Sequence, residues 1–177
     1  PDSPQRPVRR RALEDGKIVY MAVPRLRDVK CFLELDPDKI DDIDHATTIR
    51  GSSELGVQVG PDAVDPVDLI VAGSVAVTAD GARIGKGEGY SDLEYAVLRE
   101  LSLVSGETPL ATTVHDLQVV DETVSLEPHD VPLDLITTPS RTIRPPSREK
   151  PPGLLWDRLS EERIAEIPVL KQLQDRA

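Results

Sequence analysis

The chain has very little cysteine, few aromatic residues and no long apolar run, and each shortage excludes a class of protein. Cys31 is the only cysteine among 177 residues, so no internal disulfide framework can form, which fits a reducing cytoplasm. The sequence contains no stretch of about eighteen consecutive apolar residues, the length that a helix needs to span a bilayer. No signal peptide is recognisable. We therefore expect a folded cytoplasmic domain without a membrane span.

Positive charge is also scarce, and lysine is the rarer of the two main basic residues. Lysine and arginine total 21 against 32 aspartates and glutamates, which gives a net charge of −11. Such a surface disfavours nucleic acid or an anionic membrane as the main partner. Because an acidic, lysine-poor surface stays hydrated in concentrated salt, the composition suggests a salt-loving, archaeal source.

The order of apolar segments indicates strands alternating with helices. Leu93, Val97 and Leu101 fall on one face of a predicted helix over 91–104. The polar, irregular stretch 40–60 is interpreted as a long loop. The other expected elements are a helix over 7–13, strands over 17–23, 29–35, 67–73, 110–114, 118–120, 135–137 and 142–143, and a hairpin over 76–84. This order predicts an α/β fold, an open three-layer α/β/α domain with a mainly parallel sheet.

The composition changes towards the carboxyl terminus. Residues 144–153 are rich in proline and predict a stiff, extended linker. Residues 154–177 show a helical pattern that Pro168 interrupts. We therefore expect one domain over 1–143, followed by the linker and by a helical tail that docks on the domain or on a neighbouring subunit.

Three histidines suggest metal binding or acid–base chemistry. His45 has aspartates near it in the sequence but no second histidine or cysteine, so a solvated acidic loop is the favoured interpretation. His115 and His129 are each followed by an aspartate, and either pair is expected to orient a substrate or to pin a loop by hydrogen bonds. The serine-hydrolase pattern G-x-S-x-G does not occur.

The most informative segment is rich in glycine and precedes the predicted helix. Gly85, Gly87 and Gly89 let the backbone approach a ligand closely, and the helix start adds N–H groups that suit phosphate. Lys86 supplies a mobile positive charge, and Asp92 in the first helical turn can hold magnesium. The spacing matches neither the Walker pattern nor the dinucleotide fingerprint, so an ordinary surface turn is the alternative on spacing alone.

Three stretches of the chain, 85–92, 68–76 and 127–134, carry a family resemblance. The first resembles the G-x-G-x-G-Y-Y-D-R nucleotide-binding motif of 5-formyltetrahydrofolate cyclo-ligases, also called methenyltetrahydrofolate synthetases. The second resembles their strand and glycine turn, and the third their E-x-H-D-x-P-L-D segment. With the upstream helix and strand, the resemblance covers roughly residues 7–143. It is greatest to a divergent subgroup, found in archaea and in the methenyltetrahydrofolate synthetase domain-containing proteins of animals.

The resemblance implies a fold related to those of CoA transferases and sugar-phosphate isomerases. It also implies ATP- and magnesium-dependent conversion of 5-formyltetrahydrofolate to 5,10-methenyltetrahydrofolate by a monomer or small homo-oligomer. A reduced folate and ATP would be the small-molecule partners. Lys86 and Tyr90 are implied as catalytic residues, and Asp92 as the magnesium ligand. The implied nucleotide-binding residues are Gly85, Lys86, Gly87, Glu88, Gly89, Tyr90, Ser91 and Asp92.

The chain also departs from the family pattern. Ser91 replaces the second Tyr, Leu93 replaces the Arg, and Ala72 replaces the Pro before the glycine turn. The family's basic first helix, whose Lys and Arg contact ATP phosphates, is expected to be missing, since the chain begins at Pro1. A non-catalytic nucleotide- or folate-binding module of the same fold is the alternative. A sugar-phosphate or acyl-CoA enzyme of the related fold is disfavoured, because no catalytic motif for those reactions is present.

Overall fold

The computed structural model describes residues 2–176 and divides the chain into two compact units. The first unit joins Pro1–Asp65 with Leu155–Ala177, and the second unit is Pro66–Leu154. The proline-rich segment predicted as a linker thus groups with the second unit, and almost all of the predicted tail groups with the first. No helix in the described part of the chain is both long and apolar enough to cross a bilayer.

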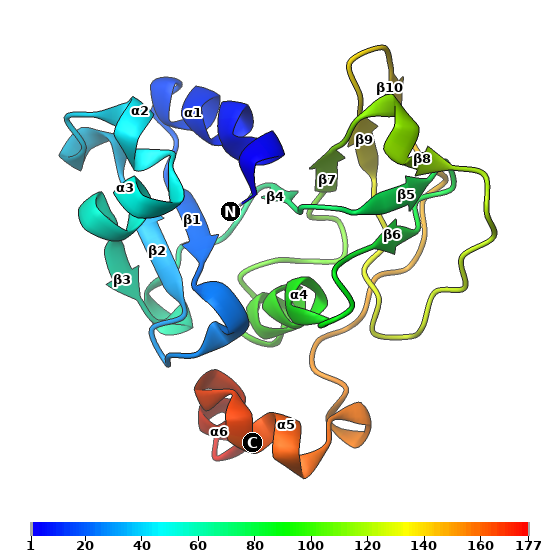
Figure 1. The fold of residues 1–177 in the computed structure, drawn as a ribbon. Helices are drawn as coiled ribbons and strands as arrows, with labels where there is room; N and C mark the ends of the chain where they lie inside the picture. Colours follow the sequence, from blue (N-terminus) through cyan, green and yellow to red (C-terminus); the bar gives the residue numbers. More distant parts are fainter. Residues whose placement is uncertain (1, 177) are drawn as a thin grey trace. The chain divides into compact units, whose positions relative to one another are not determined.

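The first unit is built on a three-stranded antiparallel sheet in the order β1-β2-β3, beside a group of helices (Figure 1). Its strands are β1 (Val19–Ala22), β2 (Phe32–Leu35) and β3 (Val57–Val59). Its α-helices are α1 (Arg6–Glu14), α2 (Ile43–Ala46), α3 (Ile49–Leu55), α5 (Glu161–Glu166) and α6 (Pro168–Gln174). The buried cluster that joins the sheet to α1 and α2 consists of Leu13, Met21, Leu35, Ile40 and Ala46.

The prediction of a long loop over 40–60 is wrong, because polar side chains in this stretch cap two helices. The Asp42 carboxylate accepts the N–H of His45 at 2.9 Å, and the Thr48 hydroxyl accepts the N–H of Gly51 at 2.8 Å. A Cβ atom at Gly51 would lie 1.9 Å from the carbonyl oxygen of His45, so glycine permits this close contact between α2 and α3. Aspartate and threonine are favoured N-cap residues, so the composition that suggested a loop instead marks helix starts.

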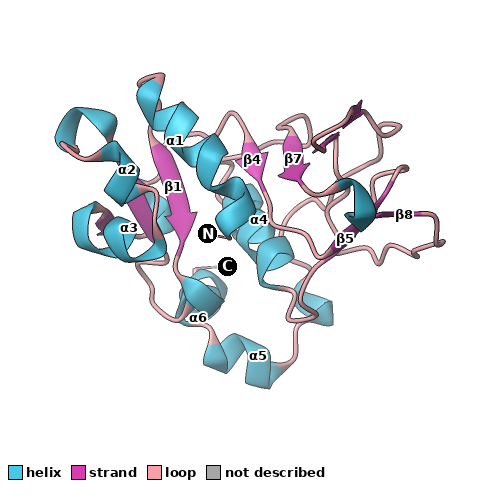
Figure 2. Cartoon of the chain, turned by 45° about the horizontal axis from the view of Figure 1, so that its top comes forward, coloured by secondary structure: helices cyan, strands magenta, loops and turns pink. Residues whose placement is uncertain are grey.

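Two short helices lie within the stretch predicted as a helical tail, and Pro168 is the first residue of the second helix. Helices α5 and α6 follow one another with a bend between them (Figure 2). Leu170 and Leu173 are buried, and the Ser160 hydroxyl caps α5 by accepting the N–H of Arg163 at 3.1 Å. Arg176 makes two 2.8 Å contacts with the carboxylate of Asp62. The tail is therefore part of the first unit.

The second unit contains two small mixed sheets and the longest helix. Its elements are β4 (Ile70–Val71), β5 (Ala76–Thr78), β6 (Arg83–Ile84), α4 (Tyr90–Glu100), β7 (Leu110–Thr113), the 3-10 helix η5 (Asp116–Gln118), β8 (Val119–Val120), β9 (Leu135–Thr137) and β10 (Thr142–Ile143). The strand orders are β10-β9-β7-β4 and β6-β5-β8. Figure 2 shows β4 and β7 side by side, and their pairing is parallel.

A mixed α/β fold is confirmed, but the mainly parallel sheet is wrong for residues 2–176. The parallel pairings β4–β7, β7–β9 and β5–β8 all lie in the second unit. The sheet of the first unit is entirely antiparallel, as are the pairs β5–β6 and β9–β10. The pairs β1–β2, β5–β6 and β9–β10 have connections shorter than the dozen residues or so that a parallel crossover needs, whereas β2 and β3 are joined by the longer stretch that contains α2 and α3. The three-layer arrangement stays a prediction.

Two elements of the second unit are shorter than predicted. The helix expected over 91–104 ends at Glu100, and Ser102 has a φ of 59° in the left-handed region, which stops the helix. The strand expected over 67–73 is reduced to the two residues of β4. The predicted hairpin is confirmed, and it turns at Gly81, where φ is 96°.

Candidate active site

The glycine-rich segment connects β6 directly to α4. Gly87 and Gly89 have φ values of 84° and 70°, in the left-handed region that favours glycine. A Cβ atom at either position would meet nothing within 4 Å, so these glycines are required for backbone geometry rather than for space. Gly89 is the N-cap residue of α4, and no side chain caps the helix. The helix start can therefore direct N–H groups at an anionic ligand.

Arg83 connects the three stretches that carry the family resemblance, although the sequence reasoning did not single it out. Its Nη2 atom lies 2.7 Å from Oδ2 of Asp92, and its Nη1 donates to the carbonyl of Gly73 at 3.4 Å. The other carboxylate oxygen of Asp92 accepts the N–H of Val131 at 3.1 Å. One ion pair thus ties the start of α4 to the turn after β4 and to the segment 127–134.

This ion pair is buried. Only 6% of the Arg83 side chain and 14% of the Asp92 side chain are exposed. Gly85 leaves room for the guanidinium, because a Cβ atom there would lie 3.2 Å from Nη1 of Arg83. Charges in such surroundings need a partner, since a lone buried charge is very costly. We call the contact region of Arg83, Asp92, Gly73 and Val131 the loop entrance. The ion pair therefore fixes its geometry.

The described residues do not form a metal centre by themselves. No group of three or more histidine, cysteine, aspartate or glutamate side chains in 2–176 is placed to hold a metal. Both oxygens of Asp92 are already engaged, one by a guanidinium and one by an N–H group. His45 contacts a single carboxylate oxygen, that of Glu54, at 2.7 Å. The metal role of Asp92 stays a prediction, and it would require ligands from a bound phosphate, as is usual for magnesium.

The other predicted nucleotide-binding residues lie along the loop and the first turn of α4. Lys86 and Glu88 are exposed between the glycines. Tyr90 is the first residue of the helix and is half-buried, and Ser91 follows it. Of the two residues predicted to be catalytic, Lys86 thus lies on the exposed strand-to-helix connection, and Tyr90 lies at the half-buried start of α4.

The contacts of His115 and Asp116 favour a loop-pinning role. Nδ1 of His115 accepts the N–H of Leu117 at 3.2 Å and so caps η5. Asp116 accepts hydrogen bonds from the hydroxyls of Ser140 and Thr138. These hydrogen bonds, that of Ser140 first, lower the pKa of the Asp116 carboxyl. The pair therefore joins η5 to the connection between β9 and β10.

His129 and Asp130 lie next to the ion pair of the loop entrance. Nε2 of His129 is 3.6 Å from Oδ1 of Asp130, whose other oxygen accepts the N–H of Glu127 at 2.8 Å. The next residue, Val131, is the one whose N–H binds Asp92. The structure thus brings the segment 127–134 to the first turn of α4.

A glycine-rich loop that opens a helix within a mixed α/β unit is a geometry compatible with phosphate binding, and it occurs in several classes of protein. The comparison with protein-family models narrows the choice among these classes. The model of the 5-formyltetrahydrofolate cyclo-ligase family matches residues 1–139. The chain belongs to this family.

Curated relatives cover almost the whole chain. The methenyltetrahydrofolate synthase domain-containing protein of Mus musculus is 44% identical over 181 residues, which is 99% of this chain and 48% of the relative. The protein of the same name from Homo sapiens is 42% identical, over 99% of this chain and 47% of the relative. The 5-formyltetrahydrofolate cyclo-ligase of Mycolicibacterium smegmatis is 30% identical over 98 residues, 52% of this chain and 47% of that protein.

The chain spans about half the length of the curated relatives that it matches. The identities to the mouse and human proteins confirm the resemblance to the methenyltetrahydrofolate synthetase domain-containing subgroup. The predicted salt-loving archaeal source finds no support in them.

Proposed function

We propose that the protein converts 5-formyltetrahydrofolate to 5,10-methenyltetrahydrofolate at the expense of ATP. The observation that carries this proposal is the Arg83–Asp92 ion pair, which joins all three stretches that resemble the family. Membership of the cyclo-ligase family supports the same substrate class.

The loop between β6 and α4 is proposed to hold the triphosphate. Gly87 and Gly89 give the backbone the left-handed turns that direct successive N–H groups to one side, and the uncapped start of α4 continues that array. Lys86 is exposed on the same loop and would neutralise charge on the transferred phosphoryl group. Phosphoryl transfer asks a protein mainly for positioning and for such charge stabilisation.

The chemistry would proceed in two displacements. The formyl oxygen attacks the γ-phosphorus of ATP, and ADP leaves with the electron pair of the broken P–O bond. The second nitrogen of the folate then attacks the activated formyl carbon and loses its proton. That attack closes the ring, and phosphate then departs with the former formyl oxygen to leave the carbon–nitrogen double bond of the methenyl product. Activation is needed because a formamide carbonyl is a poor electrophile.

The remaining groups are proposed to position the substrates. Tyr90, half-buried at the first position of α4, would lie where nucleotide and folate meet. Magnesium, when bound with ATP, would offset phosphate charge, and Asp92 is the carboxylate proposed to reach it. Ser91, in place of the family's second tyrosine, leaves that position without an aromatic ring against the folate.

The direct test is turnover by the purified protein with 5-formyltetrahydrofolate, ATP and magnesium chloride. We expect the methenyl product and ADP to form in equal amounts, and neither product when ATP is omitted. Lys86→Ala is expected to lower turnover by roughly 10²–10³-fold, the usual effect of removing one preorganised charge contact. Because Lys86 is exposed, the melting temperature should stay unchanged.

The matched control is Lys171→Ala, which removes an exposed lysine from α6 in the first unit. It should leave turnover unchanged. Nucleotide binding without any product would contradict the proposal and leave a binding module of the same fold. Equal product with and without ATP would also contradict it.

A further inference from the structure

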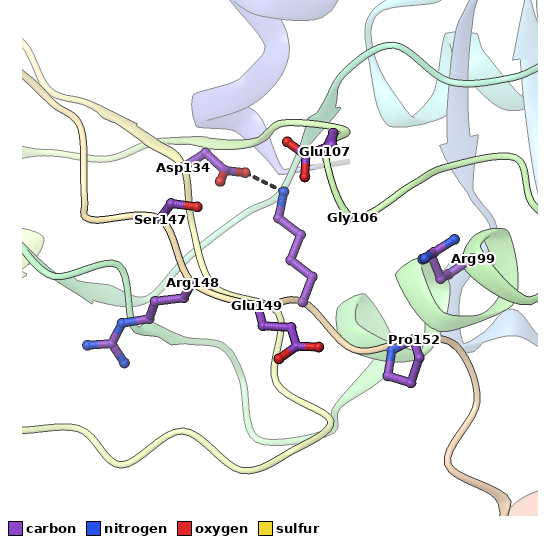
Figure 3. A pocket seen from close by; sticks show the side chains of 9 residues that line it. Arg99, Gly106, Glu107, Asp134, Ser147, Arg148, Glu149 and Pro152 are labelled. Atoms are coloured by element: carbon purple, nitrogen blue, oxygen red, sulfur yellow. Dashed lines mark ion pairs between the residues drawn. The ribbon is translucent and has the colours of Figure 1, made fainter.

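A polar pocket lies in the second unit, and the proposed activity does not use it. It has a volume of about 340 Å³ (Figure 3). Its lining residues, all within Pro66–Leu154, are Arg99, Gly106, Glu107, Asp134, Ser147, Arg148, Glu149, Lys150 and Pro152. The volume falls within the usual range for small-molecule sites, at its lower end.

The pocket lies at the opposite end of the parallel strands from Gly73. Gly106 and Glu107 precede β7, and Asp134 precedes β9, so these residues mark the amino ends of both strands. Gly73 follows the carboxyl end of β4, which runs parallel to β7, and it contacts Arg83. The pocket is therefore separate from the loop entrance.

Lys150 is a buried cation with an unused donor. Only 2% of its side chain is exposed, and Nζ lies 2.7 Å from both Oδ2 of Asp134 and the carbonyl oxygen of Thr108 (Figure 3). An ammonium group has three N–H donors. No third acceptor is present among residues 2–176, so this lysine can still donate one hydrogen bond.

Arg99 also has an unused donor at this pocket. Its Nε is buried and lacks a hydrogen-bond partner in the described part of the chain. Its Nη1 donates to the carbonyl of Val104 at 3.4 Å. It forms no ion pair with any residue in 2–176. A buried donor without an acceptor is costly, so a ligand oxygen that reached this atom through a small shift of the side chain would be favoured.

The rim of the pocket has the opposite charge. Glu107 and Glu149 are exposed, and neither forms an ion pair within residues 2–176. Of the other charged lining residues, Lys150 pairs with Asp134 and Arg148 pairs with Asp80, whereas Arg99 has no ion-pair partner in the described part of the chain. The lining therefore offers unused donors in its buried part and unpaired carboxylates at its rim.

We propose that this pocket binds a small zwitterion of the α-amino acid class. The ligand carboxylate would accept hydrogen bonds from Arg99 and Lys150, and its ammonium group would face Glu107 and Glu149. A plain anion would meet two unpaired carboxylates, and a plain amine would leave the buried donors without an acceptor. The proposal does not depend on the cyclo-ligase activity.

Calorimetric titration of the purified protein tests this assignment with glycine, L-alanine and L-glutamine, and with propionate and ethylamine as matched compounds. Each matched compound lacks one of the two charged groups of L-alanine. We expect at least one amino acid to bind, and propionate and ethylamine each to bind at least tenfold more weakly than L-alanine. Failure of all three amino acids to bind with a dissociation constant of about 1 mM or better would overturn the proposal. Equal binding of propionate and L-alanine would also overturn it.

Two variants locate the binding. Glu107→Gln changes an exposed side chain, and it should weaken L-alanine binding while strengthening propionate binding, because it removes one of the carboxylates that repel an anion. Arg99→Gln should weaken both compounds. Glu122→Gln, an exposed position of the same unit outside the pocket, is the matched control and should change neither. Wild-type affinity for L-alanine in both Glu107→Gln and Arg99→Gln would show that it binds elsewhere.

Discussion

Replacement of Arg83 by methionine should destabilise the second unit strongly. The change leaves the carboxylate of Asp92, 14% exposed, with the N–H of Val131 at 3.1 Å as its remaining contact, and it removes a donor from the carbonyl of Gly73. Removing one partner of a buried ion pair costs about 3–5 kcal/mol. Because Asp92 keeps one hydrogen bond and some exposure, we expect the lower end, about 3 kcal/mol. A loss of that size lowers the melting temperature of a chain of this length by about 6–12 °C.

Native-state hydrogen exchange of the α4 amides measures this loss in the second unit directly. Asp92→Asn and the double variant Arg83→Met/Asp92→Asn complete a thermodynamic cycle. The double variant leaves neither charge unpaired, so its destabilisation should be smaller than the sum of the two single losses. For directly contacting charges we expect the difference to be about 1–3 kcal/mol.

Arg148→Met is the matched control, because it removes an arginine of the same unit that pairs with an aspartate at the surface. The side chains of Arg148 and Asp80 are 41% and 52% exposed, so this change should cost about 0–1 kcal/mol. If Arg83→Met is no more destabilising than Arg148→Met, or if the cycle is additive, the pair does not organise the loop entrance.

Two further predictions concern the supporting structure. Ser140→Ala should raise the pKa of Asp116 towards its ordinary value, because the Ser140 hydroxyl is the largest contribution that lowers it. A carboxyl pKa that folding lowers stabilises the fold above about pH 3.9, and this stabilisation is lost as the pH falls through the folded-state pKa. The difference in stability between Ser140→Ala and wild type should therefore close in acid. Carboxyl NMR titration and acid unfolding measure both effects, and an unchanged Asp116 pKa would contradict the assignment. Gly51→Ala should cost about 1–3 kcal/mol or more, because its Cβ would lie 1.9 Å from the carbonyl oxygen of His45. Gly106→Ala, with no atom within 4 Å of the new Cβ, should change stability by less than about 0.5 kcal/mol, and equal melting temperatures for the two variants would contradict the packing argument.

Local patterns were sufficient to predict most strands but not their pairing. Apolar and β-branched runs placed β1, β2, β7 and β9 close to their observed positions. Pairing depends on which distant strand lies alongside, and the antiparallel β1-β2-β3 sheet brings Phe32 opposite Val59. Nothing within either segment specifies that partner, so the mainly parallel sheet was inferred from the order of elements and was wrong for the first unit.

The helices α2 and α3 were missed for a different physical reason. They have only four and seven residues, so periodicity gives little signal, and they begin at the side-chain caps of Asp42 and Thr48. Isolated helices this short are unstable in water, so tertiary contacts must maintain them. The contact between Gly51 and His45 is of that kind, and it joins residues on two different helices.

The glycine loop was predictable from the sequence, whereas the ion pair at its entrance was not recognised. The spacing of the glycines predicted a strand-to-helix connection, and the structure places it between β6 and α4. Arg83 was not selected, although a signal for it exists. It pairs in register with Val77, which is fully buried, so a cation stands on the inward face of a strand. Such a cation requires a buried anion nearby, and the acidic residue in the first turn of the next helix, Asp92, is the one that meets it. An acidic residue after a glycine loop therefore has two possible cationic partners, a bound metal or an arginine of the preceding strand. In this chain the register of β5 and β6 places Arg83 on the inward face beside Asp92, so the arginine is the partner that is present before any ligand binds.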